Sequence, residues 1–162
     1  DRFNVSGAGT LHYGLDLSLR WQLTEEVDFA VDASLARHEY DSDVELLGSA
    51  GNIIGNQVDT APEHFGSARL GWNFLPQARA ELEWVHMSEY FLDPDNQHKY
   101  DGHDLLNLRL TGAWKQLDFG IRATNITDED YAERADYGFG SYRYFVGEPR
   151  SVYFEVGYRF AP

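Results

Sequence analysis

The chain has 162 residues, of which 43% are hydrophobic, 15% aromatic and 25% charged, so it can form one folded domain and is too apolar for a disordered chain. Its 27 acidic and 13 basic residues leave a formal net charge of −14, which argues against nucleic acid as a partner. The absence of cysteine excludes a disulfide framework, a cysteine-ligated metal and a cysteine nucleophile. No run of about 18 apolar residues marks a membrane-spanning helix, whereas membrane-spanning strands, in which every second residue meets lipid, fit this composition.

Apolar and polar residues alternate along much of the chain. From Leu11 to Leu23 the odd positions are leucine, tyrosine or tryptophan and the even positions are small or polar, unbroken over 13 residues. A period of two places the two sets on opposite faces of a strand, and about 9–11 residues suffice for a tilted strand to cross a bilayer. The same pattern recurs in segments 27–38, 68–74, 78–84, 106–114, 117–123 and 152–160. We therefore predict an all-β chain: an antiparallel up-and-down meander of about seven long strands.

The connections between these segments alternate strictly in length. Tight turns are expected near 24–26, 75–77 and 115–116, and long connections rich in Gly, Asp, Asn and Pro at 41–62, 91–104 and 128–149. A soluble β-sandwich has no reason for this alternation. A membrane barrel has short turns on one side and long loops on the other, so the pattern favours part of a transmembrane β-barrel.

Charge and aromatic residues divide the chain in the same way. Segments 41–60, 91–104 and 128–149 hold 14 acidic and 3 basic residues, which places most of the net negative charge on one rim. Large aromatic residues lie on the apolar parity, several of them at the short-turn ends of strands. Such rings favour the membrane–water interface, so we expect an aromatic belt. Its members are Trp21, Trp72, Phe74, Trp84, Trp114 and Phe160.

Seven strands are an odd number, whereas complete bacterial barrels normally have an even number. The chain also starts at Asp1 with no basic or apolar targeting segment. We therefore expect residues 1–162 to be the C-terminal segment of a larger barrel, with the N-terminal barrel strands absent.

Three segments near the end resemble the C-terminus of TonB-dependent outer-membrane receptors: Asn125–Arg134, Tyr144–Tyr153 and Val156–Phe160. Upstream, Tyr13–Asp16, Asp59–His64 and Tyr100–Leu108 are similar to further motifs of that family. The motif residues are Asn125, Asp128, Tyr131, Gly147, Pro149, Arg150, Gly157 and Phe160. We interpret them as structural, because Asn and Asp side chains bond nearby backbone at strand ends and Pro is tolerated at the start of a strand.

The resemblance implies a bacterial outer-membrane barrel of about 22 strands with an N-terminal plug, which this chain lacks. It implies TonB-energised uptake of a scarce nutrient, with a ferric siderophore or other iron complex as the foremost ligand. Implied partners are outer-membrane lipid and lipopolysaccharide, the missing plug and strands, and TonB through the missing N-terminal part. One departure is Ala161-Pro162 after Phe160, because the family usually ends on the aromatic residue.

Catalytic and metal chemistry find little support, so we expect no enzyme and no cofactor. Glu81 and Glu83 share one face of a strand, but Arg79 beside them indicates a charge network. The six histidines show no local metal-ligand spacing. His98 and His103, with acidic residues nearby, raise a cation site as an alternative to a solvated acidic loop.

Aromatic and polar residues of the long loops are the candidates for ligand contact, because their rings offer stacking surfaces for a catecholate, porphyrin or sugar. The alternative is that each of these rings packs the loops together. The candidates are Tyr90, Phe91, His98, Tyr100, Tyr137, Phe139, Tyr142 and Tyr144. Two other functions stay open: a passive porin-like barrel, and a soluble carbohydrate-binding or hydrolytic β-sandwich.

Overall fold

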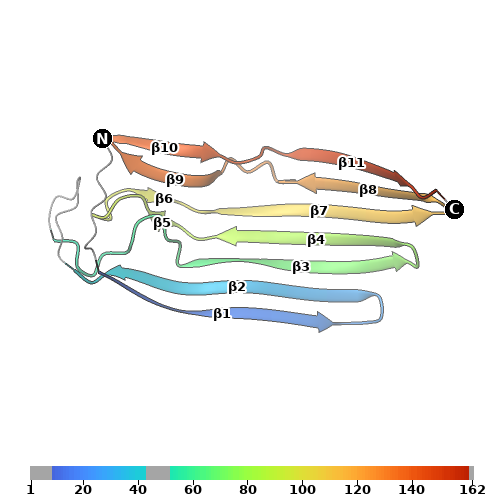
Figure 1. The fold of residues 1–162 in the computed structure, drawn as a ribbon, viewed down its shortest axis with the longest axis horizontal. Helices are drawn as coiled ribbons and strands as arrows, with labels where there is room; N and C mark the ends of the chain where they lie inside the picture. Colours follow the sequence, from blue (N-terminus) through green and yellow to red (C-terminus); the bar gives the residue numbers. More distant parts are fainter. Residues whose placement is uncertain (1–8, 43–51, 161–162) are drawn as a thin grey trace.

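The computed structural model describes residues 9–42 and 52–160. Seven long strands form one antiparallel sheet in the order β1-β2-β3-β4-β7-β8-β11, in which neighbours are successive long strands of the chain (Figure 1). Their bounds are β1 Thr10–Gln22, β2 Val27–Tyr40, β3 His64–Leu75, β4 Ala78–Met87, β7 His103–Trp114, β8 Leu117–Thr124 and β11 Ser151–Tyr158. The predicted all-β meander of seven long strands is confirmed. No helix long and apolar enough to cross a membrane occurs in the described residues.

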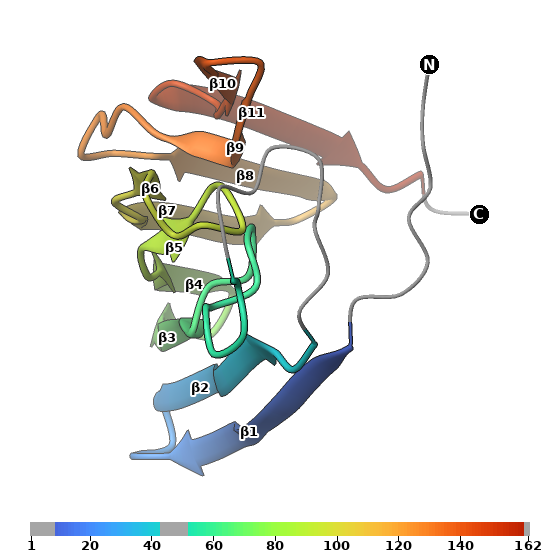
Figure 2. The ribbon, with the colours of Figure 1, turned by 90° about the vertical axis from the view of Figure 1, so that its left-hand side faces the viewer.

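The sheet curves into an open arc with β1 and β11 at its two ends (Figure 2). Alternating side chains point to opposite sides of the sheet, which we call the concave face and the convex face. Large apolar residues of the convex face, such as Leu17, Leu70 and Trp72, are about half exposed. Among the described residues no second sheet covers them, so the chain does not form the two-sheet sandwich considered as an alternative.

Three tight turns join the long strands at one end. Between β1 and β2, the Thr24 hydroxyl accepts hydrogen bonds from the Glu26 and Val27 amides at 3.2 and 3.1 Å. Between β7 and β8, Lys115 has a positive φ of 56°, which a two-residue hairpin turn requires. The turns therefore fall where the sequence predicts them.

The other end of the sheet carries two short hairpins, which the sequence analysis treats only as loops. They consist of β5 Tyr90–Phe91 with β6 Lys99–Tyr100, and β9 Ala132–Gly138 with β10 Ser141–Val146. At the tip of the second hairpin Phe139 and Gly140 have φ values of 54° and 76°, as in a type I′ turn. These strands are too short for periodicity to reveal them.

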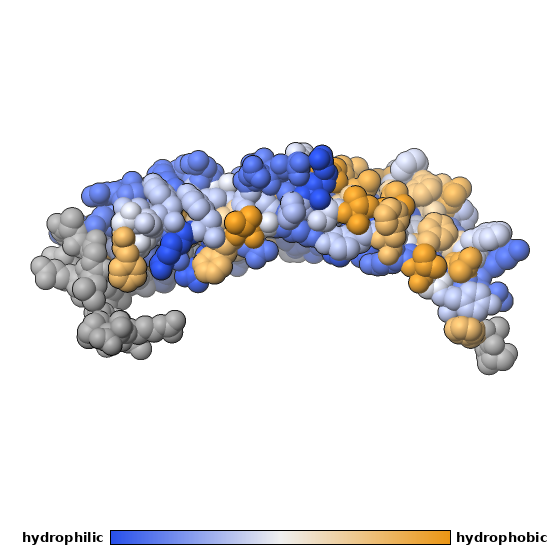
Figure 3. Space-filling view, turned by 90° about the horizontal axis from the view of Figure 1, so that it is seen from above, coloured by the Kyte–Doolittle hydropathy of each residue, from blue (hydrophilic) through white to orange (hydrophobic). Residues whose placement is uncertain are grey.

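Most of the buried hydrophobic residues of the described part of the chain lie in these hairpins and the connections beside them. Tyr90, Leu92, Tyr100, Ala132 and Ala135 form one cluster where the two hairpins meet. Hydropathy follows the long axis of the molecule: apolar side chains gather toward the short-turn end, and hydrophilic ones toward the hairpin end (Figure 3). The fold is thus a single two-faced layer with a packed polar cap at one end.

Candidate functional site

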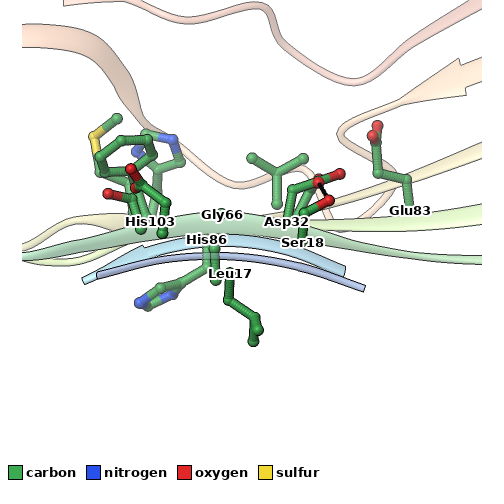
Figure 4. Close-up of a pocket in the computed structure, with 14 residues that line it drawn as sticks. Leu17, Ser18, Asp32, Gly66, Glu83, His86 and His103 are labelled. Atoms are coloured by element: carbon green, nitrogen blue, oxygen red, sulfur yellow. Dashed lines mark hydrogen bonds between the residues drawn. The ribbon is translucent and has the colours of Figure 1, made fainter. Parts of the chain in front are cut away.

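The concave face carries a network of charged side chains over β1 to β4. Asp32 is its centre: it accepts two hydrogen bonds from Arg20 at 2.8 and 3.0 Å, one from Arg69 at 3.2 Å and one from Ser18 at 2.8 Å. Figure 4 shows two sets of side chains on opposite sides of the sheet, with Ser18, Asp32, Glu83 and His103 on the concave side and Leu17 and His86 on the convex side. The alternation read from the sequence therefore separates a polar concave wall from an apolar convex one.

The pair of glutamates weighed as acid and base belongs to this wall. Arg79 donates to Asp28 at 2.6 and 2.9 Å and to Glu81 at 3.4 Å. Glu83 instead accepts from the Asn107 side-chain amide at 3.0 Å. Each glutamate therefore has its own polar partner on the concave face.

The wall also carries a hollow with a volume of about 620 Å³ beside this network. Charged and hydroxyl side chains such as Asp32, Ser67 and Glu83 line part of it. Phe65 and Met87, which pair across β3 and β4, line it toward the hairpin end. Phe65 and Met87 thus add an apolar patch to the concave face, beside the imidazole of His103.

Two of the tyrosines predicted as ligand contacts join the two hairpins through their hydroxyls. The Tyr90 hydroxyl accepts from the Ala135 amide at 2.9 Å, and the Tyr100 hydroxyl accepts from the Ala132 amide at 3.0 Å. Both rings are buried, and their burial raises the pKa of each phenol. Because both rings are buried, we leave Tyr90 and Tyr100 out of the ligand surface proposed below.

Four other candidates do form one aromatic group, which we call the loop aromatic cluster: His98, Tyr137, Tyr142 and Tyr144. The His98 ring stacks on Tyr137 with centroids 3.6 Å apart, and Tyr142 meets Tyr137 edge-on at 5.2 Å. Tyr144 lies parallel to Tyr142 at 6.0 Å. Tyr142 and Tyr144 are about half exposed, so the cluster offers ring faces at the surface.

The last two candidates lie apart from that cluster. Phe139 is fully exposed at the tip of the β9–β10 hairpin. The Phe91 ring lies 4.8 Å from the Lys99 ammonium, which itself pairs with Glu89 at 2.6 Å. Of the eight predicted contacts, the structure therefore groups four, buries two and separates two.

The histidines raised as a cation site have other partners. His98 Nδ1 is hydrogen-bonded to Asp93, whose carboxylate also accepts from the backbone amides of Gln97 and His98. His103 Nδ1 is hydrogen-bonded to the Tyr100 hydroxyl at 2.8 Å. Within residues 9–42 and 52–160, no group of three or more metal-ligating side chains occurs.

The Asn125 motif connects the segment that precedes β9 with the segment that precedes β11. We call this set of contacts, made by Asn125, Asp128, Tyr131, Gly147 and Arg150, the lock. Asn125 is buried with a positive φ of 49°, and its side chain bonds Glu129 N at 2.9 Å, Glu129 O at 2.9 Å and Glu148 O at 3.1 Å. Asp128 pairs with the Arg150 guanidinium at 3.0 Å. These contacts join two turns more than 20 residues apart.

Tyr131 and Gly147 make the second half of this lock. The Tyr131 ring lies so close to Gly147 that a Cβ on the glycine would fall 2.2 Å from the ring. The Glu148 amide donates to the Tyr131 hydroxyl at 3.2 Å. A hydrogen bond from the Tyr153 hydroxyl holds the pKa of the Glu148 carboxyl below its usual range. Pro149 precedes β11, in which Gly157 lies opposite Asp118.

The aromatic residues assigned to a belt lie on the convex face and are exposed: Trp21, Trp72, Phe74, Trp84, Trp114 and Phe160. Trp84 stands apart from Trp114. It pairs with Leu106, eight residues before Trp114 on β7, which corresponds to about 26 Å along the strand. Its indole N–H donates to Asp104 at 2.9 Å, at the position where the convex face becomes polar. Trp84 thus marks the edge of the apolar band that faces the loops. Ala161-Pro162 lie outside the described residues.

A comparison with models of protein families shows to which family this chain belongs. The sequence profile described as "TonB dependent receptor-like, beta-barrel" matches residues 2–126. The chain belongs to this family. This is the family that the sequence motifs resemble. The comparison with curated protein sequences gave no match.

Solved structures share the fold of this TonB-dependent receptor-like chain at low sequence identity. The siderophore receptor PiuA from Acinetobacter baumannii is 17% identical with a TM-score of 0.80, over 93% of this chain and 22% of that one. The ferric yersiniabactin uptake receptor FyuA from Yersinia pestis is 18% identical with a TM-score of 0.79, over 95% and 24%. The unliganded ferric citrate transporter FecA is 21% identical with a TM-score of 0.78, over 94% and 25%.

The TonB-dependent receptor-like chain therefore spans about a quarter of the length of these structures. The family and the matched proteins are named as receptors and transporters, in agreement with the prediction that the protein is not an enzyme.

Proposed function

We propose that this chain is the C-terminal part of the barrel of a bacterial outer-membrane receptor that takes up an iron complex, foremost a ferric siderophore, with energy from TonB. The observation that carries the proposal is the family match over residues 2–126 on a sheet with one apolar and one polar face. The solved structures with this fold are receptors for a siderophore, ferric yersiniabactin and ferric citrate, which supports iron as the substrate class.

In this proposal the convex face meets outer-membrane lipid and lipopolysaccharide, and the concave face lines the lumen. The apolar band between Trp84 and Trp114 is about 26 Å long along β7, and a strand tilt of about 40° gives it a height of about 20 Å, against roughly 25 Å for the apolar band of outer-membrane barrels. The hairpin end faces outside the cell. The plug, the other barrel strands and the TonB contact belong to parts of the receptor outside these 162 residues.

The loop aromatic cluster is the proposed contact for the ligand. Its exposed rings, Tyr142 and Tyr144, are parallel and lie on a hairpin held by the buried Tyr90 and Tyr100 hydroxyls. A rigid base under exposed rings reduces the conformational entropy lost when a flat ligand stacks on them. We place Phe139, at the hairpin tip, as a first contact for the ligand.

The test uses the full receptor and a strain from which its gene is deleted. Under iron limitation, we expect the deletion strain to lose uptake of at least one radiolabelled ferric siderophore, and the plasmid-borne gene to restore it. Addition of a proton-gradient uncoupler separates the mechanisms, because TonB-driven uptake stops whereas passive diffusion through a porin continues. Fractionation should place the receptor in the outer membrane.

Each other result points elsewhere. Outer-membrane location with uncoupler-resistant uptake would replace the receptor by the porin-like barrel. Normal iron uptake in the deletion strain would move the search to cobalamin, haem or sugars. A soluble product would overturn the membrane assignment.

A further inference from the structure

The structure brings together two histidines that lie 26 residues apart in the sequence. His12 on β1 pairs directly with His38 on β2, and both lie on the concave face. Their Nδ1 atoms are 2.6 Å apart, with ring centroids at 4.9 Å and an interplanar angle of 57°. Two imidazole nitrogens thus point at the same small volume from adjacent strands.

We propose that His12 and His38 form a chelating site for a divalent transition metal, foremost Cu²⁺. Imidazole nitrogen binds Cu²⁺, Ni²⁺ and Zn²⁺ at about 2.0–2.1 Å, so two nitrogens on one ion lie roughly 3 Å apart. The side chains need to separate by only a few tenths of an ångström to admit the ion. Cu²⁺ is the preferred occupant, because it binds nitrogen donors most tightly among these ions and accepts water at its other positions.

Thr10 supplies the outer contact that orients the first ligand. Its hydroxyl lies 2.7 Å from His12 Nε2. In the tautomer in which Nε2–H donates to Thr10, the lone pair of His12 Nδ1 accepts a hydrogen bond from His38 Nδ1–H. The metal takes the place of that proton, which is released to solvent or moves to His38 Nε2. Metal-binding histidines usually donate the second ring N–H to such a partner, which holds the tautomer and the ring orientation.

Within the described residues, small side chains flank this site on one side and a hydrogen-bonded strand end flanks it on the other. The next concave row toward the short turns holds only Gly14 and Ala36, which are too small to screen the imidazoles. On the loop side, the buried Tyr40 donates its hydroxyl to Asp59 at 2.5 Å, and the Val58 amide donates to the His38 carbonyl at 2.9 Å. These bonds hold the end of β2, so His38 is placed before a metal arrives.

The experiment measures Cu²⁺ binding to the purified full receptor in detergent, without a histidine tag. At one equivalent of Cu²⁺, electron paramagnetic resonance should show hyperfine splitting from two imidazole nitrogens. We expect His12→Asn and His38→Asn each to remove one nitrogen from the spectrum and to weaken binding about tenfold or more, because chelation by two imidazoles is lost. Thr10→Val should weaken binding less than either histidine variant does. Thr10→Ser keeps the hydroxyl and should bind copper as the unaltered receptor does.

The control is His64→Asn, which changes an exposed histidine of the neighbouring strand β3 and should leave the spectrum unchanged. The heat-dependent gel mobility of each variant verifies that the barrel is folded. The proposal is overturned if the His12 and His38 variants bind copper as the unaltered receptor does, or if the spectrum shows a single nitrogen. Because the readout is binding, its result does not depend on whether the receptor transports a siderophore.

Discussion

At the scale of single residues, buried tyrosine hydroxyls stabilise the loops by accepting hydrogen bonds from backbone amides. The Tyr90 hydroxyl satisfies the Ala135 amide, and both residues are buried. Tyr90→Phe leaves that amide without a partner, so we expect the free energy that holds the β9–β10 hairpin closed to fall by about 1–3 kcal/mol. Hydrogen exchange of the β9 amides in the detergent-solubilised receptor measures this change.

Tyr144→Phe is the matched control, because Tyr144 is half exposed. It should leave exchange in β9 unchanged while it alters one of the proposed ligand rings. Equal exchange in Tyr90→Phe and the unaltered receptor would contradict the role given to the hydroxyl.

At the scale of elements, the lock between β8, β9 and β11 depends on one glycine. A Cβ at position 147 would meet the Tyr131 ring at 2.2 Å, and the ring is held by its hydroxyl at the Glu148 amide. We expect Gly147→Ala to destabilise the connection between β10 and β11 by about 1–3 kcal/mol, because the ring must move and lose that bond. Faster proteolysis of residues 139–150 would report the change.

Gly157→Ala serves as the comparison for that variant. A Cβ there would lie 3.7 Å from the Asp118 Cβ, which is an ordinary contact. We expect it to be cut as slowly as the unaltered receptor. If Gly147→Ala is equally resistant, then the close packing of ring and glycine does not stabilise this connection.

At the scale of the whole molecule, the two faces of the sheet should tolerate charge differently. Leu70 lies on the convex face between Phe29 and Leu82, whereas Ser67 lies on the concave face opposite Asp32. If the convex face meets lipid, Leu70→Arg should cost about 2–4 kcal/mol of folding free energy, as it does for arginine near the bilayer midplane. Ser67→Arg, beside the Asp32 carboxylate, should cost little.

Heat-dependent gel mobility of the full receptor, refolded in lipid over a urea series, gives both free energies. The two positions are three residues apart on β3, so local strand propensity is nearly the same for both. Equal costs would contradict the assignment of the convex face to lipid.

The sequence predicted the sheet better than it predicted the site. The alternation from Leu11 to Leu23 extends over β1 almost residue for residue, since a period of two is a local property of a strand with two different environments. The hairpin β9–β10 was missed, because six or seven residues with mixed polarity show no such period. Loop residues of the same type, such as Tyr100 and Tyr144, cannot be told apart by pattern, yet one is buried and the other exposed.

The sequence by itself determined the two faces, the number of long strands and the alternation of short turns with long loops. These features follow from local periodicity and from turn residues, which do not depend on the rest of the chain. Only the tertiary structure decided which rings pack and which stay exposed, and that His12 faces His38. Such contacts depend on strand register and on the packing of loops that are distant in sequence. Their partners are close in space but have no fixed separation along the chain, so no sequence pattern reveals them.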